Sequence, residues 1–361
     1  MRVGAKPGGP LEWLLVKMNL IPTPLIDSFS AMMNAKAILA ANELGLFNAL
    51  AERPLTVRVL AKHLGASVRG VSDLADALAA NGYLARKGDR VSLSRISRKW
   101  LVSSSPNYIG NMLEHVNDLW AVWLNLEEAI RVGAPPAAHY EDWLKDKDYK
   151  HILSRHIVGL RDAARLSAPE MLRAVRLPAA KQARGADSTS RRLLDIGGGH
   201  GGYSIAFCQK YADLTAIVFD LEATVEIGRE IVAREQMAGR VEFQAGDFLK
   251  DDFDTGYAAA LYFNILHNFS EKDNKCVLAK AYAALRPGGV LAVWDMFKET
   301  AGERDALPAL MALHMLVASG GTSYVIDDVD GWLEEIGFRH IVHKKTRTLP
   351  GYTFVIARKP E

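Results

Sequence analysis

The sequence has little that would tie it to an oxidising compartment or to a membrane. Among its 361 residues only Cys208 and Cys276 are cysteines, and they do not form a CxxC pair. Two thiols cannot build a disulfide framework, so a reducing, cytoplasmic location is expected. The apolar stretch at residues 11–29 is interrupted by Lys17, two prolines and Asp27, well short of a membrane span. We interpret it as a docking helix followed by a turn, without a signal peptide or membrane partner.

Excess charge of one sign and metal-ligand clusters are lacking as well. The formal net charge is +2, which indicates no nucleic acid or other polyanion as a partner. Neither an HExxH motif nor a cysteine cluster occurs, so no metal site is predicted. The length exceeds what one hydrophobic core usually supports, and more than one domain is therefore expected.

A polar stretch at residues 181–192 separates two kinds of sequence pattern. The chain before it has helical periodicity almost throughout, whereas short apolar runs alternate with amphipathic helices after it. The pattern predicts an N-terminal helical domain over residues 1–105, a helical connector over 106–185 and an α/β domain over 186–361.

The apolar runs of the last domain have the length of buried strands. They are "RLLDIG", "TAIVFD", "VEFQAGD", "AALYFN" and "VLAVWDM". Strands of this kind alternating with helices predict a parallel sheet that is covered on both faces. The final "RHIVHKKTRT" and "GYTFVIARK" flank a short turn at Pro350-Gly351, which makes two antiparallel neighbours. The fold class is therefore α/β, a mostly parallel sheet with an antiparallel edge strand.

The N-terminal domain has a pattern of its own. Residues 36–50 predict one amphipathic helix, residues 56–65 and 67–82 a pair of helices, and residues 83–94 a hairpin around Lys87-Gly88-Asp89. Helices followed by a hairpin are typical of a winged helix-turn-helix, which often binds DNA. However, the second helix of the pair offers only Arg69 to a phosphate, and Asp73 would repel one. The module can equally serve as a dimerisation platform.

The segment "LLDIGGGHGG" at residues 193–202 is the most distinctive motif. Gly197, Gly199 and Gly202 satisfy G-x-G-x-x-G between a predicted strand and a predicted helix. Asp220 ends the next strand, where a carboxylate can accept the hydroxyl groups of a ribose. Both NAD and S-adenosylmethionine place an adenosine ribose there, so a nicotinamide oxidoreductase is one alternative.

Three details favour S-adenosylmethionine over NAD. Asp195 stands directly before the glycines, and its carboxylate suits an ammonium or sulfonium group better than a pyrophosphate. Gly246-Asp247-Phe248 follow the third strand and offer a carboxylate and an aromatic ring to an adenine. The fourth strand leads into Asn264-Ile265-Leu266-His267, which places a base beside the cofactor. Ligands bind at the carboxyl ends of the strands in sheets of this kind.

These motifs resemble a known family. "LLDIGGGHGG", "VFDLEATVE", "GDF", "NILHNFSEKD" and "LRPGG" are similar to the S-adenosylmethionine-dependent O-methyltransferases of the caffeic acid and hydroxyindole type, which bacterial small-molecule enzymes share. The resemblance implies a Rossmann-like class I methyltransferase sheet and an N-terminal winged-helix dimerisation domain. It also implies a homodimer that methylates a hydroxyl of a small aromatic or polyketide-like molecule and releases S-adenosylhomocysteine.

The resemblance also assigns roles to residues. It implies that His267 is the general base and that Asp295 orients it. The residues implied to bind the cofactor are Gly197, Gly199, Asp220, Leu221, Gly246, Asp247, Phe248 and Asn264. Those implied to contact the substrate are Trp120, His156, Met311, His314 and Met315, and Trp123 is a further candidate for this group.

Two positions depart from the family pattern. The residue after the base is usually an aspartate and is Asn268 here, and Ser323 stands where a second orienting acid is usual. A hydroxyl cannot stabilise an imidazolium as a carboxylate does. Two alternatives remain at this point. These departures suggest a methyltransferase fold with a nitrogen, sulfur or carbon acceptor or with altered chemistry, and the winged-helix pattern suggests a ligand-sensing DNA-binding regulator.

Overall fold

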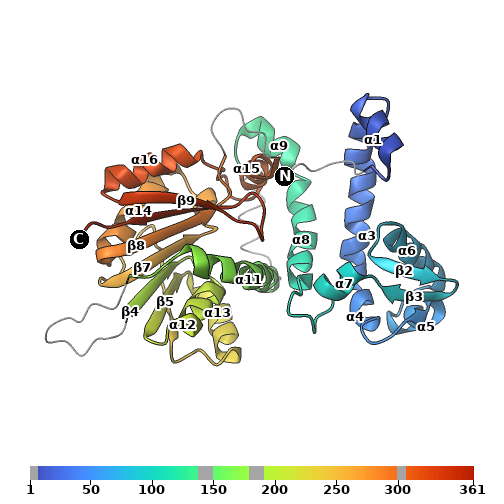
Figure 1. The fold of residues 1–361 in the computed structure, drawn as a ribbon, viewed down its shortest axis with the longest axis horizontal. Coiled ribbons are helices and arrows are strands. Elements are labelled where there is room, and N and C mark those ends of the chain that lie inside the picture. Colours follow the sequence, from blue (N-terminus) through green and yellow to red (C-terminus); the bar gives the residue numbers. More distant parts are fainter. Residues whose placement is uncertain (1–6, 137–148, 179–190, 299–305) are drawn as a thin grey trace. The chain divides into compact units, whose positions relative to one another are not determined.

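The computed structural model describes residues 7–136, 149–178, 191–298 and 306–361 (Figure 1). The chain divides into two compact units, one up to Leu119 and the other from Trp120 to Glu361. The division falls inside α8 (Gly110–Trp123), so the predicted connector over 106–185 contributes to both units. Of the polar stretch 181–192, residues 181–190 lie outside the described residues, and Arg191 and Arg192 begin the first strand of the large sheet.

The first unit begins with a series of short helices and one longer helix. They are α1 (Pro10–Lys17), α2 (Thr23–Leu25), the π-helix η1 (Ile26–Ser30), α3 (Ala31–Glu43) and α4 (Leu46–Ala49). The single helix predicted over 36–50 is thus divided. Gly45 adopts a left-handed conformation, with φ 71°, which ends α3 and starts α4.

The rest of the first unit contains the predicted helix pair and hairpin. Its elements are β1 (Leu55–Thr56), α5 (Val57–His63), α6 (Val68–Ala80), β2 (Leu84–Lys87), β3 (Arg90–Leu93) and α7 (Arg95–Trp100). Thr56 and Ser67 cap the two helices through their side-chain oxygens. Arg69, the basic residue of α6 considered above, is exposed and lies 3.8 Å from the carboxylate of Asp73.

The second unit is built around one large sheet. In the described ranges it has seven strands in the order β6-β5-β4-β7-β8-β10-β9. Their bounds are β4 (Arg191–Ile196), β5 (Leu214–Asp220), β6 (Val241–Ala245), β7 (Tyr257–Phe263), β8 (Leu285–Asp295), β9 (Arg339–Lys345) and β10 (Thr353–Arg358). β4 to β8 pair in parallel, and β10 is antiparallel to both β8 and β9. The reversed strand therefore lies one place in from the edge.

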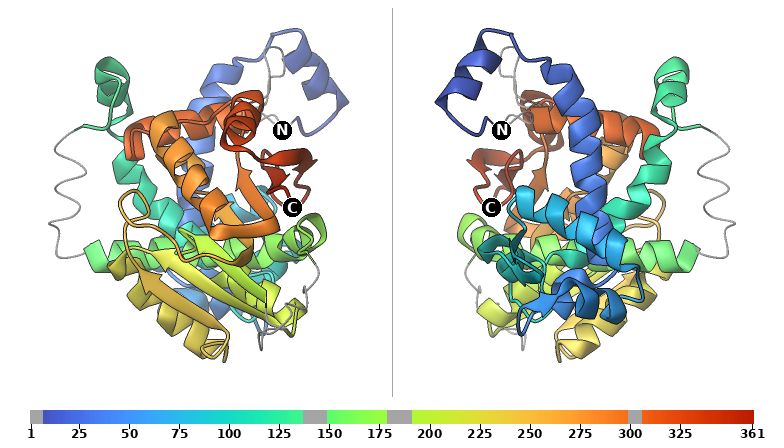
Figure 2. Two further views of the ribbon diagram at one scale, coloured as in Figure 1. Left: turned by 90° about the vertical axis from the view of Figure 1, so that its left-hand side faces the viewer. Right: turned by 90° about the vertical axis from the view of Figure 1, so that its right-hand side faces the viewer.

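Helices cover both faces of this sheet (Figures 1 and 2). Besides the end of α8 from Trp120 on, the unit contains α9 (Leu126–Val132), α11 (Tyr149–Ala174), α12 (Gly202–Lys210), α13 (Glu222–Arg234), the 3-10 turn η2 (Leu266–Asn268), α14 (Glu271–Ala284), α15 (Ala306–Ala318) and α16 (Ile326–Ile336). Side chains from α11, α12 and α13 join one buried cluster with strand residues such as Leu193. Side chains from α14 and α16 join another with Leu194, the next residue along β4. This alternation is the reason why the strands are apolar almost throughout.

The strand order decides where a ligand can bind. β4 lies between β5 and β7, so the connections after β4 and β7 lead to opposite sides of it. Parallel strands end at one common edge, and such a switch in direction leaves room there for a ligand. Within the described ranges, no helix is both long and apolar enough to cross a bilayer.

A substitution at Gly228 on α13 tests how closely this helix must approach the glycine segment. A Cβ at Gly228 would lie 2.4 Å from the carbonyl oxygen of Gly199 and 2.4 Å from the Phe243 ring. We expect Gly228→Ala to lower the free energy of unfolding by roughly 1–3 kcal/mol, because overpacking must shift the backbone or the ring. Urea unfolding measures this. Gly239→Ala is the control, since a Cβ there meets nothing within 4 Å; equal stability of the two variants would contradict the close approach.

Candidate active site

The glycine loop after β4 has a backbone that side chains would obstruct. Gly197, Gly199 and Gly201 all have positive φ, at 66°, 45° and 63°. A Cβ on Gly197 would lie 2.6 Å from the side chain of Ile265, which follows β7. Gly201 is the N-cap of α12, so the loop opens directly into a helix. The loop therefore presents backbone N–H groups and a helix N-terminus at the carboxyl edge of the sheet.

Asp195, the penultimate residue of β4, lies under this loop. Its side chain is buried, with 1% of the residue exposed, and a Cβ on Gly198 would lie 2.4 Å from the carboxyl carbon. Oδ2 accepts a hydrogen bond from Ser204 Oγ at 2.7 Å, whereas Oδ1 has no hydrogen-bond partner among the described residues. Burial, followed by the nearby charge of Asp220, raises the pKa of Asp195 to about 7. A buried acid with an unsatisfied oxygen indicates a site that is completed by a positively charged or hydrogen-bonding ligand.

Asp220, at the end of β5, is tied to the same loop. Its Oδ2 accepts from the N–H of Gly199 at 2.9 Å, and its Oδ1 accepts from the N–H of Leu221 at 2.8 Å. Burial raises the pKa of Asp220 to about 6 in spite of these hydrogen bonds. The neighbouring Leu221 is 57% exposed, an apolar surface beside the carboxylate. This pairing of an acid with an apolar side chain fits the ribose and adenine of an adenosine.

The turn after β6 is closely packed. A Cβ on Gly246 would lie 2.4 Å from the Phe219 ring, so the position needs a glycine. Phe248 is buried and packs edge-to-face against Phe269. The carboxylate of Asp247 forms an ion pair with Lys250 at 2.8 Å, and this hydrogen bond lowers the pKa of Asp247. The predicted adenine contacts of Asp247 and Phe248 remain predictions.

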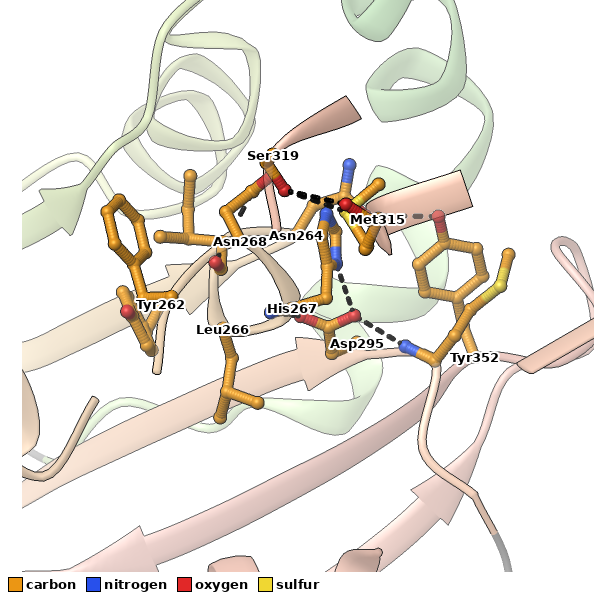
Figure 3. A network of polar contacts seen from close by, with 12 residues as sticks. Tyr262, Asn264, Leu266, His267, Asn268, Asp295, Met315, Ser319 and Tyr352 are labelled. Carbon is orange, nitrogen blue, oxygen red and sulfur yellow. Dashed lines mark hydrogen bonds and ion pairs between the residues drawn. The ribbon is translucent and has the colours of Figure 1, made fainter. Parts of the chain in front are cut away.

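His267 and Asp295 form a buried hydrogen-bonded pair (Figure 3). His267 belongs to η2, after β7, and Asp295 ends β8. The ring Nδ1 of His267 lies 2.7 Å from Asp295 Oδ1, and the backbone N–H of Met296 donates to the same oxygen at 2.7 Å. The backbone N–H of His267 donates to Oδ2 at 3.3 Å. Since a carboxylate only accepts, Nδ1 carries the hydrogen and Nε2 presents a lone pair, as a general base requires.

The turn that carries His267 is held by buried polar groups. Asn274 of α14 donates from Nδ2 to the carbonyl oxygens of Leu266 and Phe269, and its Oδ1 accepts from the hydroxyl of Tyr262. Behind the turn, the N–H of Thr322 donates to the carbonyl oxygen of His267 at 2.9 Å. These bonds fix the base from both sides, so its ring orientation does not depend on a bound substrate.

Asn264, at the end of β7, adopts a left-handed conformation with φ 61°. The hydroxyl of Tyr352 donates to its Oδ1 at 3.0 Å, and the Tyr352 ring stacks on Trp294 at a centroid distance of 4.2 Å. The hydrogen bond leaves the Nδ2 group of Asn264 as the free end of the amide, and Figure 3 shows it on the same side as His267 Nε2. Asn264 therefore lies beside His267, and the next residue, Ile265, contacts the glycine loop.

Several of the predicted substrate residues come together around the base. The charge of His267 acts on both His156 of α11 and His314 of α15, and His156 also responds to His314. Burial, the larger cause, lowers the pKa of each of these two histidines to about 4. Met315, next to His314, is buried and lies close to His267 in Figure 3. Trp120 on α8 and Met311 on α15 are half-buried, and their predicted substrate contacts remain predictions.

The two departures from the family pattern have different surroundings. The side chain of Asn268 donates to the carbonyl oxygen of Ile265 at 3.3 Å, within its own turn. Ser323 is buried, and its Oγ has no hydrogen-bond partner in the part of the chain that the structure describes. A Cβ at the nearby Gly321 would lie 1.9 Å from the carbonyl oxygen of His267, so this loop must contain a glycine. Asp295 is thus the acid seen to orient His267.

Sequence reasoning missed two residues that shape the site, Tyr352 and Asn274. Tyr352 precedes the reversed strand β10, far along the chain from its partner Asn264. Asn274 lies within an amphipathic helix, where an asparagine gives no signal. The partner of Tyr352 becomes evident only from the antiparallel pairing of β10, and the partners of Asn274 only from the packing of α14.

Comparison with known proteins gives the family. A family model of the O-methyltransferase domain matches residues 140–339, and one of the O-methyltransferase dimerisation domain matches residues 26–103. A naphthoate O-methyltransferase of Streptomyces sahachiroi, acting on 3-hydroxy-5-methyl-1-naphthoate, is 29% identical over 88% of this chain and 89% of its own length. The N,N-dimethyltransferase OxyT of Streptomyces rimosus is 28% identical over 93% and 96%. Human N-acetylserotonin methyltransferase, solved with S-adenosylmethionine, shares the fold, with 22% identity, a TM-score of 0.81 and coverage of 99% and 100%.

The chain therefore belongs to the O-methyltransferase family. It is an S-adenosylmethionine-dependent O-methyltransferase, and the predicted fold, enzyme class and cofactor are confirmed. The residues present fit this cofactor: the loop has no room for side chains at Gly197 and Gly198, and the unsatisfied Oδ1 of Asp195 suits a cation. A nicotinamide oxidoreductase is excluded.

Asp195→Asn tests whether the buried acid serves the cofactor. The pKa of Asp195 rises from 3.8 to about 7 on folding, so its ionisation destabilises the protein increasingly above pH 3.8 and fully above about pH 7. We expect the variant, without cofactor, to be more stable than the wild type by roughly 1–3 kcal/mol at pH 8, with a smaller gain at pH 5.5. Thermal and urea unfolding at the two pH values measure this.

The same variant should distinguish the two forms of the cofactor. S-adenosylmethionine carries a sulfonium charge that S-adenosylhomocysteine lacks, and the neutral amide of the variant would no longer attract that charge. We expect calorimetry at pH 8 to show that the variant prefers S-adenosylmethionine over S-adenosylhomocysteine less strongly than the wild type does. Asp254→Asn, at an exposed acid that pairs with Arg192, is the control. An unchanged ratio would place Asp195 outside the reach of the sulfonium.

Proposed function

We propose that this enzyme methylates a hydroxyl group of a small aromatic or polyketide-like molecule, with His267 as the general base. The 2.7 Å hydrogen bond from His267 Nδ1 to Asp295 carries the proposal, because it leaves Nε2 as the ring nitrogen with a lone pair. The relative from Streptomyces sahachiroi methylates a hydroxyl of a naphthoate, which supports an aromatic acceptor. OxyT acts on nitrogen, so the relatives do not by themselves identify the acceptor atom. The assignment of an oxygen acceptor depends on His267 as the general base.

The chain's residues suit the proton transfer. A phenol has a pKa of about 10 and is mostly neutral at pH 7, so it must lose its proton as it attacks. Nε2 of His267 takes that proton, and the carboxylate of Asp295 stabilises the imidazolium and holds the ring in place. The two hydrogen bonds from backbone N–H groups to Asp295 keep the carboxylate in position throughout.

The glycine loop and its acids hold the methyl donor. Residues 197–201 would receive the methionine part, Asp220 the ribose hydroxyls, and Leu221, Asp247 and Phe248 the adenine. When bound, S-adenosylmethionine supplies a methyl group on a positively charged sulfur. Asn264 and His267 both follow β7, so the acceptor oxygen meets the base next to the loop. Holding the reacting atoms in line supplies much of the acceleration in such a transfer.

His267→Ala separates base chemistry from cofactor binding. We expect the variant to bind S-adenosylhomocysteine as the wild type does and to lose about 100- to 10,000-fold in turnover, which is what a general base contributes. Calorimetric titration with S-adenosylhomocysteine, with NADH as the negative control, and a methyl-transfer assay on a panel of naphthols measure the two quantities. His63→Ala, at an exposed histidine on α5, is the matched control. Undiminished turnover would remove the proposed base.

We also propose that the enzyme is a homodimer formed through its N-terminal unit. A run of large apolar side chains in the first helices of that unit is exposed, at 44–70%: Leu11, Trp13, Leu14, Met18, Leu20, Leu25, Phe29, Met32 and Met33. Exposed apolar surface on this scale is typical of an interface. The match to a dimerisation domain over residues 26–103 supports a second copy of the chain as the partner.

The double variant Phe29→Asp/Met33→Asp tests the dimer. We expect its dissociation constant to rise at least about tenfold, because burying two carboxylates in an apolar interface costs far more than 1.4 kcal/mol. Sedimentation equilibrium measures the mass. Val342→Asp, at an exposed apolar residue of the edge strand β9, is the control. A double variant that remains as dimeric as this control would place the interface elsewhere.

A further inference from the structure

Trp123 and His314 meet edge to edge. The indole Nε1 of Trp123, at the end of α8, lies 3.1 Å from Nδ1 of His314 on α15. Their ring planes differ by only 7°, and the ring centroids are 6.1 Å apart. Nearly parallel planes with nitrogens at this distance are the arrangement of a hydrogen bond that runs close to the plane of the imidazole, along its lone pair.

This hydrogen bond fixes the tautomer of His314. An indole N–H only donates, so Nδ1 of His314 must carry a lone pair and accept. The hydrogen of the neutral ring is then on Nε2. Burial and the charge of His267 lower the pKa of His314 to about 4, which keeps the ring neutral at pH 7. His314 therefore presents a hydrogen-bond donor at Nε2 and no charge.

His267 has the opposite tautomer. Asp295 accepts from its Nδ1, so its Nε2 presents a lone pair. α15 packs against η2, the turn that carries His267, and the charge of His267 helps to lower the pKa of His314. Titratable groups near them in the described ranges include His156 on α11, with its pKa lowered to about 4, and Asp295 on β8, together with Tyr262 and Tyr352, on which the charge of Asp295 acts. The site thus combines one ring nitrogen that takes a proton with another that offers a hydrogen bond.

We propose that His314 is a specificity-determining residue, which donates its Nε2–H to a second oxygen of the methyl acceptor. This rests on the proposed function. The preferred acceptor is then an aromatic molecule that carries a carbonyl-type oxygen in addition to the hydroxyl that His267 deprotonates. An acceptor without that oxygen leaves the donor of His314 unsatisfied once water is displaced, which costs affinity. Trp123 is a positioning residue, since it acts only through the tautomer of His314.

A matched pair of acceptors tests this preference. One is a naphthol with an acetyl group meta to its hydroxyl, so that the two groups cannot bond to each other, and the other has an ethyl group in place of the acetyl. Calorimetry on the full-length protein saturated with S-adenosylhomocysteine measures both affinities. We expect the acetyl compound to bind about tenfold more tightly, the effect of one good hydrogen bond.

Two substitutions of His314 separate its donor from its bulk. His314→Leu should remove the preference for the acetyl compound. His314→Gln should retain most of it, because a glutamine amide can accept from Trp123 and still donate outward. His63→Leu on α5 is the control. Equal affinities in the wild type, or a preference that survives His314→Leu, would overturn the proposal.

The cofactor distinguishes failure of this inference from failure of the proposed function. If the protein binds S-adenosylhomocysteine but neither naphthol, the inference about the acceptor is wrong and the cofactor site stands. If methyl transfer to the naphthols occurs with equal efficiency for both, the proposed function holds without the specificity. If S-adenosylhomocysteine itself does not bind, both are wrong.

The tautomer can be observed directly. In protein labelled with nitrogen-15 histidine, and with the His314 signals assigned from the His314→Gln spectrum, we expect an unprotonated Nδ1 and a protonated Nε2. Trp123→Phe should convert this pattern into a mixture of tautomers and reduce the acetyl preference together with it. Trp100→Phe, at a half-buried tryptophan of α7, is the control. A protonated Nδ1 in the wild type would overturn the proposal.

Discussion

In the proposed mechanism, the chemistry of this enzyme depends on the hydrogen bond between His267 and Asp295. It sets the tautomer of the base, and it exists only because the parallel strands β7 and β8 end side by side at one edge of the sheet. The turn that follows β7 is then held by Asn274 and by the loop at Gly321, which passes too close to His267 for any side chain. Much of the surrounding structure therefore fixes the orientation of the His267 ring.

The two buried aspartates at this edge are arranged in opposite ways. Asp295 accepts hydrogen bonds on both oxygens, whereas Asp195 leaves one oxygen without a partner in the described structure. In the proposed mechanism, the first arrangement stabilises the imidazolium of His267 that forms during turnover. The second destabilises the fold when Asp195 is ionised, and sites of function are where such local conflicts are expected. The unsatisfied acid is thus better evidence of a cofactor than the satisfied one.

The site differs from the family pattern in the groups that surround His267. Ser323 supplies no second carboxylate to the base, so Asp295 acts without that support. His156 and His314 are kept neutral by burial, and neither adds a positive charge that would oppose the imidazolium of His267. In the proposal above, His314 contributes a neutral donor toward the acceptor instead. The polar chemistry of the acceptor side is then carried by imidazoles rather than by acids.

The sequence by itself determined the strands, the glycine loop, the cofactor and the positions of His267 and Asp295, because apolar periodicity and short motifs depend on neighbours along the chain. It did not determine the break of the predicted helix at Gly45, the place of β10 inside the edge, or the partners of Asn264 and His314. Tyr352 reaches Asn264 only through the final antiparallel pairing, and Trp123 reaches His314 only because distant helices pack together. Contacts between residues far apart in the chain depend on the packing of whole elements, and no local pattern records that packing.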